Sequence, residues 1–113
     1  MPKELWPHYL LGIFDGDGCF TYQQRVRFDK YKSVEGKFQI TNNNLLLLNN
    51  LRDKCGFGYG KIYKSNHGNY YNWVICKTEE LLIIYRYMYS QMSFCLNRKK
   101  NKFEEFLSLK GKI

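Results

Sequence analysis

The sequence of 113 residues lacks a stretch of 18 apolar residues, a signal peptide, a linker and any repeat or low-complexity segment. A membrane-spanning or secreted protein is therefore not expected. Its four cysteines form no C-x-x-C pair, which argues against a zinc site built from cysteines. A disulfide framework is not expected either, because 44% of the residues are hydrophobic and supply a core. The sequence predicts one soluble intracellular domain over residues 1–113, with reduced thiols.

Positive charge is in excess. The chain has 18 Lys and Arg against 10 Asp and Glu, which gives a formal net charge of +8. Such an excess favours an anionic partner, with nucleic acid ahead of a membrane surface. The alternative is a domain that is basic for solubility alone, so the charge by itself decides little.

Hydrophobic periodicity predicts an α+β domain with the order αββαββαα. Strict alternation of apolar and polar residues predicts half-buried strands, whereas the helices begin at Pro, Asn or Thr and stop at Gly. The first helix is expected to end at the glycines that follow it, and residues 29–36 are expected to form a loop. The expected helices are 7–14, 45–54, one capped by Thr78 and one capped by Asn97, and the expected strands are 19–28, 37–41, 59–65 and 70–76.

One face of the predicted strands is polar and carries no acid among the assigned residues. Arg and Lys contact phosphates and guanine edges, and Gln and Asn pair with adenine. The alternative is an ordinary solvated sheet face, but the net charge favours nucleic acid. A strand of about nine residues spans roughly 30 Å, which suits a β-ribbon in the major groove of DNA, with RNA as the alternative. The candidate DNA-binding residues are Thr21, Gln23, Arg25, Arg27, Lys37, Gln39, Thr41, Lys61, Tyr63 and Asn72.

Two acids, Asp15 and Asp17, lie among glycines at the end of the first predicted helix. An EF-hand is excluded, because its twelve-residue ligand pattern does not follow. A tight turn with two solvated acids is one alternative. The other is a metal site, because a carboxylate at a helix C-terminus is unfavourable unless a cation or donors hold it. Mg²⁺ commonly binds one or two carboxylates together with phosphate oxygens, so a neighbouring nucleic-acid surface suggests phosphodiester hydrolysis.

Residues 10–18, with the sequence LLGIFDGDG, resemble the LAGLIDADG motif of homing endonucleases. Residues 38–42 (FQITN), 56–61 (GFGYGK) and 98–100 (RKK) resemble further segments of this family in the same order. The resemblance implies a saddle-shaped antiparallel sheet with helices on one face. It also implies site-specific cleavage of double-stranded DNA with Mg²⁺, with Mn²⁺ as a substitute and with Ca²⁺ supporting binding without cleavage.

The resemblance also implies roles for the residues of the motif. Asp17, the last acid, would bind the metal, with the Gly16 carbonyl as a further ligand. Asp15 would be structural and would cap or orient the turn. Leu11, Gly12, Asp15 and Gly16 would lie at the interface of two motif helices, where Leu11 replaces the usual small residue.

Further catalytic roles follow from the other segments. Asn42 would position a water molecule or a metal-bound water. A basic residue, Arg98 first and Lys99 or Lys100 next, would stabilise charge on the phosphate. From the residues alone, Asn42 is equally suited to cap a helix, and residues 98–100 are equally suited to a solvated helix start.

A single motif per chain implies a second copy, because both DNA strands must be cut. The expected assembly is a C₂ homodimer on a palindromic or nearly palindromic site of about 18–20 base pairs. Two alternatives remain: a module that binds DNA or RNA without cutting, such as an intron maturase, and an isolated half of a two-motif endonuclease. A ribosomal-type structural protein would not need the paired acids. The expected location is an organelle (mitochondrion or chloroplast) or a microbial cytoplasm.

Overall fold

The computed structural model describes residues 2–26, 32–90 and 95–113. Its elements confirm the α+β class and the order αββαββαα, with two short helical turns in addition. In chain order they are the 3-10 turn η1 (Lys3–Leu5), α1 (Trp6–Asp17), β1 (Gly18–Val26), β2 (Lys32–Asn42), α2 (Leu45–Asn50), the π-type turn η2 (Leu51–Cys55), β3 (Lys61–Lys64), β4 (Tyr71–Ile75), α3 (Thr78–Tyr89) and α4 (Asn97–Leu109).

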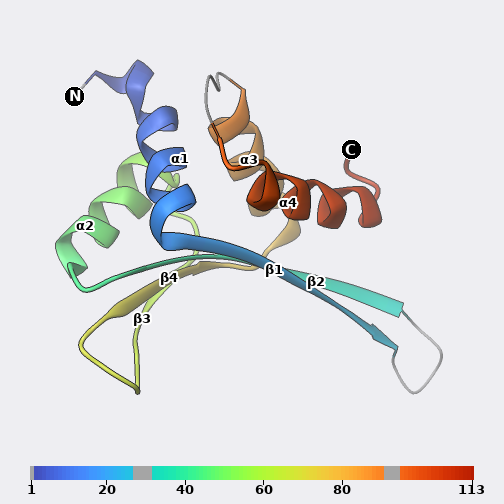
Figure 1. Ribbon diagram of the computed structural model, residues 1–113, viewed down its shortest axis with the longest axis horizontal. Coiled ribbons are helices and arrows are strands. Elements are labelled where there is room, and N and C mark those ends of the chain that lie inside the picture. The colour runs from blue at the N-terminus through green and yellow to red at the C-terminus, as the bar shows by residue number, and fades with distance from the viewer. Residues whose placement is uncertain (1, 27–31, 91–94) are drawn as a thin grey trace.

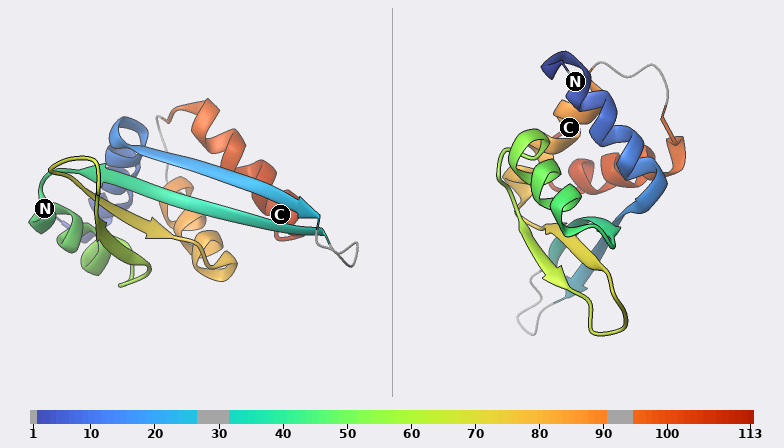
Figure 2. Two further views of the ribbon diagram at one scale, coloured as in Figure 1. Left: turned by 90° about the horizontal axis from the view of Figure 1, so that it is seen from below. Right: turned by 90° about the vertical axis from the view of Figure 1, so that its left-hand side faces the viewer.

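The four strands form one antiparallel sheet in the order β1-β2-β4-β3. The β1–β2 ribbon is the longest part and pairs Gly18 with Ile40 at one end and Val26 with Lys32 at the other. All four α-helices lie on one face of the sheet, and the opposite face is bare (Figure 1). The ends of the sheet curve away from the helices, so its bare face is concave (Figure 1). The right-hand view of Figure 2 again shows the helices on one side of the sheet.

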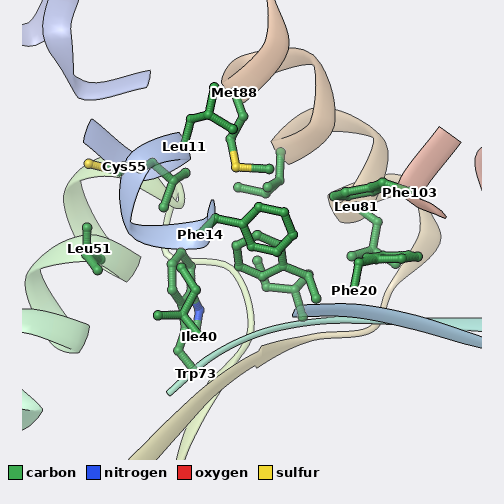
Figure 3. Packing of buried hydrophobic residues seen from close by; sticks show 14 of the residues in the cluster. Leu11, Phe14, Phe20, Ile40, Leu51, Cys55, Trp73, Leu81, Met88 and Phe103 are labelled. Atoms are coloured by element: carbon green, nitrogen blue, oxygen red, sulfur yellow. The ribbon is translucent and has the colours of Figure 1, made fainter. Parts of the chain in front are cut away.

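Aromatic side chains fix the helices to the sheet (Figure 3). Phe14 of α1 stacks on Phe38 of β2 at 4.9 Å between ring centroids, and Phe38 meets the edge of Trp73 on β4 at 5.4 Å. Phe20 of β1 stacks on Phe103 of α4 at 4.1 Å. Because all five rings are at most 3% exposed, the C-terminal end of α1 is held firmly against the sheet.

The structure departs from the sequence prediction at element ends. Helix α1 ends at a glycine, as expected, but it continues past Phe14 through Gly16 to Asp17, and the chain becomes extended only at Gly18. Strand β2 begins at Lys32, so residues 32–36 pair with β1 instead of forming a loop. Thr78 and Asn97 are not caps but the first residues of α3 and α4, whose N-cap residues Lys77 and Leu96 accept no side-chain capping bond. The Asn44 side chain does cap α2, by accepting from Leu47 N at 3.1 Å.

Cys19 and Cys76 are exposed, Cys95 is partly buried, and Cys55 is buried in the core. Within the described ranges, no helix is both long and apolar enough to cross a membrane.

Candidate functional site

The last residue of α1 meets the last residue of β2. Asp17 is exposed at the helix end, and its Oδ2 accepts a hydrogen bond from Asn42 Nδ2 at 3.3 Å. Asn42 Oδ1 in turn accepts from Asn44 N at 2.8 Å. The Asn42 amide is thereby oriented from both sides, and the helix cap is Asn44 rather than Asn42. The structure thus brings together two residues that lie 25 positions apart in sequence.

Lys99 of α4 also lies at the end of α1. Its Nζ donates to the carbonyl oxygens of Phe14 at 3.1 Å, Asp15 at 2.8 Å and Gly18 at 2.5 Å. The last carbonyls of a helix have no partner within the helix, and their partial negative charge attracts a cation. The Lys99 ammonium therefore satisfies the same helix end that exposes Asp17.

The other two basic residues of this segment have different surroundings. Arg98 is exposed. Lys100 Nζ lies 3.4 Å from Glu104 Oε1 and 5.7 Å from the ring centroid of Tyr89, on the side of α3. The contacts therefore favour Lys99 at the site, in place of Arg98, which the sequence ranked first.

Asp15 faces its own chain. Its Oδ2 accepts from Leu96 N at 2.9 Å, which ties α1 to the start of α4. Burial raises the pKa of the neighbouring Tyr89 hydroxyl, and the negative charge of Asp15 raises this pKa further. The two acids of the motif thus differ, because Asp15 joins two helices whereas Asp17 is open to solvent.

The exposed side of α1 contains glycines. Apart from the chain neighbours and the backbone of the helix itself, no atom of the described residues lies within 4 Å of the position that a Cβ would take at Gly12 or Gly16. Leu11, by contrast, is 3% exposed and packs in the core of its own chain, so its predicted place at a helix interface is wrong. Successive helix residues point about 100° apart, which lets Leu11 face the core while the next residue, Gly12, is exposed.

The residues at this helix end fit a hard divalent cation. Among the described residues, no three His, Cys, Asp or Glu side chains gather closely enough to hold a metal by themselves. Mg²⁺ does not require such a cage, because it binds one or two carboxylates together with phosphate oxygens and water. Asp17 offers an exposed carboxylate, and the neighbouring Gly16, which is also exposed, offers a carbonyl oxygen. This donor set consists of oxygen alone.

The bare face of the sheet holds the predicted nucleic-acid contacts. The strand register pairs Thr21 with Lys37 and pairs both Thr41 and Tyr63 with Asn72, so these side chains point the same way. All the predicted DNA-binding residues lie on the helix-free face of the sheet, except Arg27, which lies outside the described residues. We call this surface the bare face; it comprises Thr21, Gln23, Arg25, Lys37, Gln39, Thr41, Lys61, Tyr63 and Asn72 together with Cys19, Ser33, Glu35 and Val74.

The outer end of the bare face carries an acid that the sequence analysis missed. Glu35 pairs with Gln23 in the register, and its Oε2 lies 3.6 Å from Arg25 Nε. Arg25 also donates to Gln23 Oε1, from Nε at 3.4 Å and from Nη2 at 3.3 Å. The expectation of an acid-free face is therefore wrong. The sequence does contain a signal for this position. Glu35 lies two residues before Lys37, so it falls on the same polar face when the strand begins before Gly36.

The inner end of the bare face carries a hydrogen-bonded amide cluster. Gln39 Nε2 donates to Thr41 Oγ1 at 3.2 Å and to Asn72 Oδ1 at 3.1 Å. Thr41 Oγ1 donates to Asn72 Oδ1 at 2.6 Å. Thr41 directly precedes Asn42, so this cluster lies next to the end of α1.

Comparisons with known proteins agree with this arrangement. The LAGLIDADG endonuclease family pattern matches residues 10–109. The fold resembles an archaeal intron-encoded homing endonuclease complexed with DNA (TM-score 0.79, 20% identity), I-CvuI in complex with its target in the presence of Ca (0.76, 20%) and I-SmaMI bound to cleaved DNA (0.75, 24%).

These alignments cover 97%, 95% and 98% of this chain and 69%, 66% and 37% of the respective relatives. The chain therefore spans about two thirds of the first two and little over a third of I-SmaMI. Curated protein sequences give no match. With the family pattern covering nearly all of its length, the chain belongs to the LAGLIDADG endonuclease family.

Proposed function

We propose that this chain is a site-specific double-strand DNA endonuclease that depends on a divalent metal and acts as a homodimer. The observation that carries the proposal is the position of Asp17. Its exposed carboxylate lies at the end of a helix, next to Asn42 and beside a concave face rich in basic and amide side chains. A duplex on that face would place its backbone at the end of α1.

Each residue at the end of α1 has a separate role in the proposed reaction. Asp17 and the Gly16 carbonyl would hold Mg²⁺, which when bound lowers the pKa of an attacking water and polarises the phosphate. Asn42 would orient that water through its fixed amide. Lys99 would stabilise negative charge on the phosphate and would keep the helix end intact. Arg98, exposed at the start of α4, is then free to contact the DNA backbone.

A second copy of the chain supplies the attack on the other strand. The exposed Gly12 and Gly16 lie four residues apart on one side of α1 and would let two copies of this helix approach closely. A C₂ dimer with both Asp17 residues near its axis fits a palindromic or nearly palindromic target. Two chains carry twice the formal charge of +8, so binding should weaken steeply as salt increases.

The relatives support this proposal. One is described in complex with its target in the presence of Ca, and another bound to cleaved DNA. A second candidate is half of a two-motif enzyme, because the chain covers only 37% of I-SmaMI. Analytical ultracentrifugation distinguishes the two, since a homodimer is expected for the first and a monomer for the second.

The test uses a library of random DNA duplexes with either Mg²⁺ or Ca²⁺. The wild type should bind with either ion and cut with Mg²⁺. Asp17→Asn should abolish cutting and leave binding largely intact, because it removes the charge that holds the metal. The matched control is Asp53→Asn, which removes an exposed acid that is paired with Arg52 away from this site and should change neither property.

Two results would contradict the proposal. Cutting by Asp17→Asn at the wild-type rate would exclude its role at the metal. Binding by the wild type without cutting in any divalent ion would favour the alternative of a non-cleaving module such as a maturase.

A further inference from the structure

The amide cluster of Gln39, Thr41 and Asn72 is the most constrained group on the bare face. All three side chains are partly buried, and each is hydrogen-bonded to the other two. Gln39 and Thr41 belong to β2, and Asn72 faces Thr41 from β4. The backbone of two paired strands therefore fixes where these polar groups point.

The hydrogen bonds within the cluster determine what remains for a ligand. Gln39 uses its amide nitrogen toward Thr41 and Asn72, and Thr41 uses its hydroxyl hydrogen toward Asn72. A primary amide has one oxygen acceptor and two N–H donors. The groups left over are therefore the Gln39 oxygen, an acceptor, and the Asn72 nitrogen, a donor.

This pattern of one donor and one acceptor is the same for either orientation of the two side-chain amides. The two amide groups touch at 3.1 Å, so one must offer nitrogen where the other offers oxygen. If both were reversed together, Asn72 would present the acceptor and Gln39 the donor. In either case the cluster presents one donor and one acceptor side by side.

From this pattern we infer that the amide cluster recognises the adenine of an A·T pair in the major groove. Adenine presents an N7 acceptor and an N6 donor there, whereas guanine presents two acceptors, cytosine a donor and thymine an oxygen acceptor. Among the four single bases, one donor beside one acceptor is the complement of adenine alone. The inference rests on the proposed DNA-binding function and names the base that part of its surface selects.

A neighbouring apolar side chain fits the other half of the same base pair. Val74 lies on the bare face, directly opposite Gln39 in the register and two residues after Asn72. Thymine carries a C5-methyl group in the major groove, and apolar side chains contact it favourably. Val74 is thus placed to contact that methyl group while the amides contact adenine.

The recognised pair lies on the inner side of each half-site. Thr41 precedes Asn42, which contacts Asp17 at the proposed cleavage site. Arg25 is six residues along β1 from Cys19, the partner of Gln39, which corresponds to roughly 20 Å or about six base pairs. In a homodimer the adenine preference should therefore occur twice, near the centre of the target and symmetrically.

The test selects duplexes from a random library in Ca²⁺ and sequences those that the chain retains. The wild type should enrich A·T at one inner position of each half-site, and replacing that pair by G·C should weaken binding roughly five- to 150-fold. Asn72→Asp keeps an oxygen for the bonds to Gln39 and Thr41 but replaces the outward donor by an acceptor. The preference at that position should shift from adenine to cytosine, whose N4 is a donor.

Two further variants separate recognition from folding. Gln23→Glu, at the exposed outer end, should alter only an outer position and leave the inner adenine unchanged. Thr41→Val removes the hydroxyl that holds Asn72, so it should broaden the preference at the inner position without redirecting it to cytosine. Circular dichroism should show an unchanged fold in each variant.

The outcomes distinguish this inference from the function on which it rests. If the wild type retains no duplex, the proposed function fails and the inference fails with it. If duplexes are retained but the inner position shows no adenine, or Asn72→Asp weakens all duplexes equally, the inference alone is overturned.

Discussion

On the helix-covered side of the sheet, Phe20, Phe38 and Trp73 are at most 3% exposed, whereas on the bare face Thr21, Lys37 and Lys61 are open to solvent. These residues alternate along the same strands. One side is apolar and packs against helices, and the other is basic or amide-bearing and has no helix over it (Figure 1). Substitutions on the covered side should therefore change the stability of the fold, and those on the bare face the affinity for DNA.

The end of α1 lies at the border between the two sides. Asp15 and Lys99 bond to main-chain atoms of the chain itself and so help to hold its helices in place. Asp17 is exposed, as residues of the bare face are. Substitutions on the two sides of the sheet should therefore differ in their effects on stability and on DNA binding.

The largest effect is expected at Leu11 on the covered side. Leu11→Ala should lower the free energy of unfolding by about 2–5 kcal/mol, because a fully packed side chain leaves a cavity. Urea denaturation at several protein concentrations measures the effect. The control is Gly12→Ala, which meets no atom within 4 Å and should stabilise the single chain slightly while weakening self-association. Equal stability of the two variants would place Leu11 outside the core.

Lys99 should contribute next. Lys99→Met removes the charged donor from three carbonyls and should cost about 1.5–3 kcal/mol, with loss of cutting. Lys100→Met is the matched control, because it removes an ion pair with Glu104 and should cost only about 0–1 kcal/mol. Thermal and urea unfolding compare the two. A larger loss for Lys100→Met would contradict the role assigned to Lys99.

A pH effect is expected from Tyr85 on the covered side. Burial, followed by the hydrogen bond and charge of Glu104, raises the pKa of Tyr85 from 10.0 to about 12. The folded chain therefore holds this proton more tightly than the unfolded chain. The corresponding stability is present below pH 10 and is lost as the pH rises toward 12. Unfolding measured over this range should show a shallower decline for Tyr85→Phe than for the wild type. An equally steep decline in the two proteins would contradict the effect assigned to Tyr85.

The smallest change in stability is expected at Glu35. Its pair with Arg25 is exposed on both sides, with side-chain exposures of 51% and 61%, so Glu35→Gln should change stability by roughly 0–1 kcal/mol. The substitution removes the negative charge from the bare face and should raise DNA affinity at low salt. Glu79→Gln, which removes an exposed acid from α3, provides the same charge change elsewhere. Equal gains from both variants would mean that the position of Glu35 on the face is irrelevant.

Much of this architecture was accessible from periodicity. The alternation in residues 19–28 and 37–41 predicted which side chains face the core, and Phe20, Phe38 and Ile40 are indeed buried. The start of β2 was missed because the charged stretch before Gly36 resembles a loop. Pairing with β1 extends the strand back to Lys32, since a long partner supplies hydrogen bonds that local sequence does not reveal.

The candidate site, too, was predicted from the sequence only in part. The motif resemblance named Asp17, Asn42 and Lys99, and the structure brings all three to the end of α1. The motif resemblance did not rank Lys99 above Arg98, because adjacent residues at a helix start have similar local sequence signals. Which of them reaches the three carbonyls is decided by how α4 packs, and the structure places Lys99 there.

The sequence by itself determined the αββαββαα order, the polar strand face and the family, because periodicity and motif spacing are local properties. The tertiary structure alone decided that Leu11 is in the core, that Glu35 lies among the basic residues, and that Gln39, Thr41 and Asn72 form one cluster. Each of these depends on contacts between residues far apart in the chain or on which way one helix faces. Such contacts are fixed only when the strands are in register and the helices are packed against them.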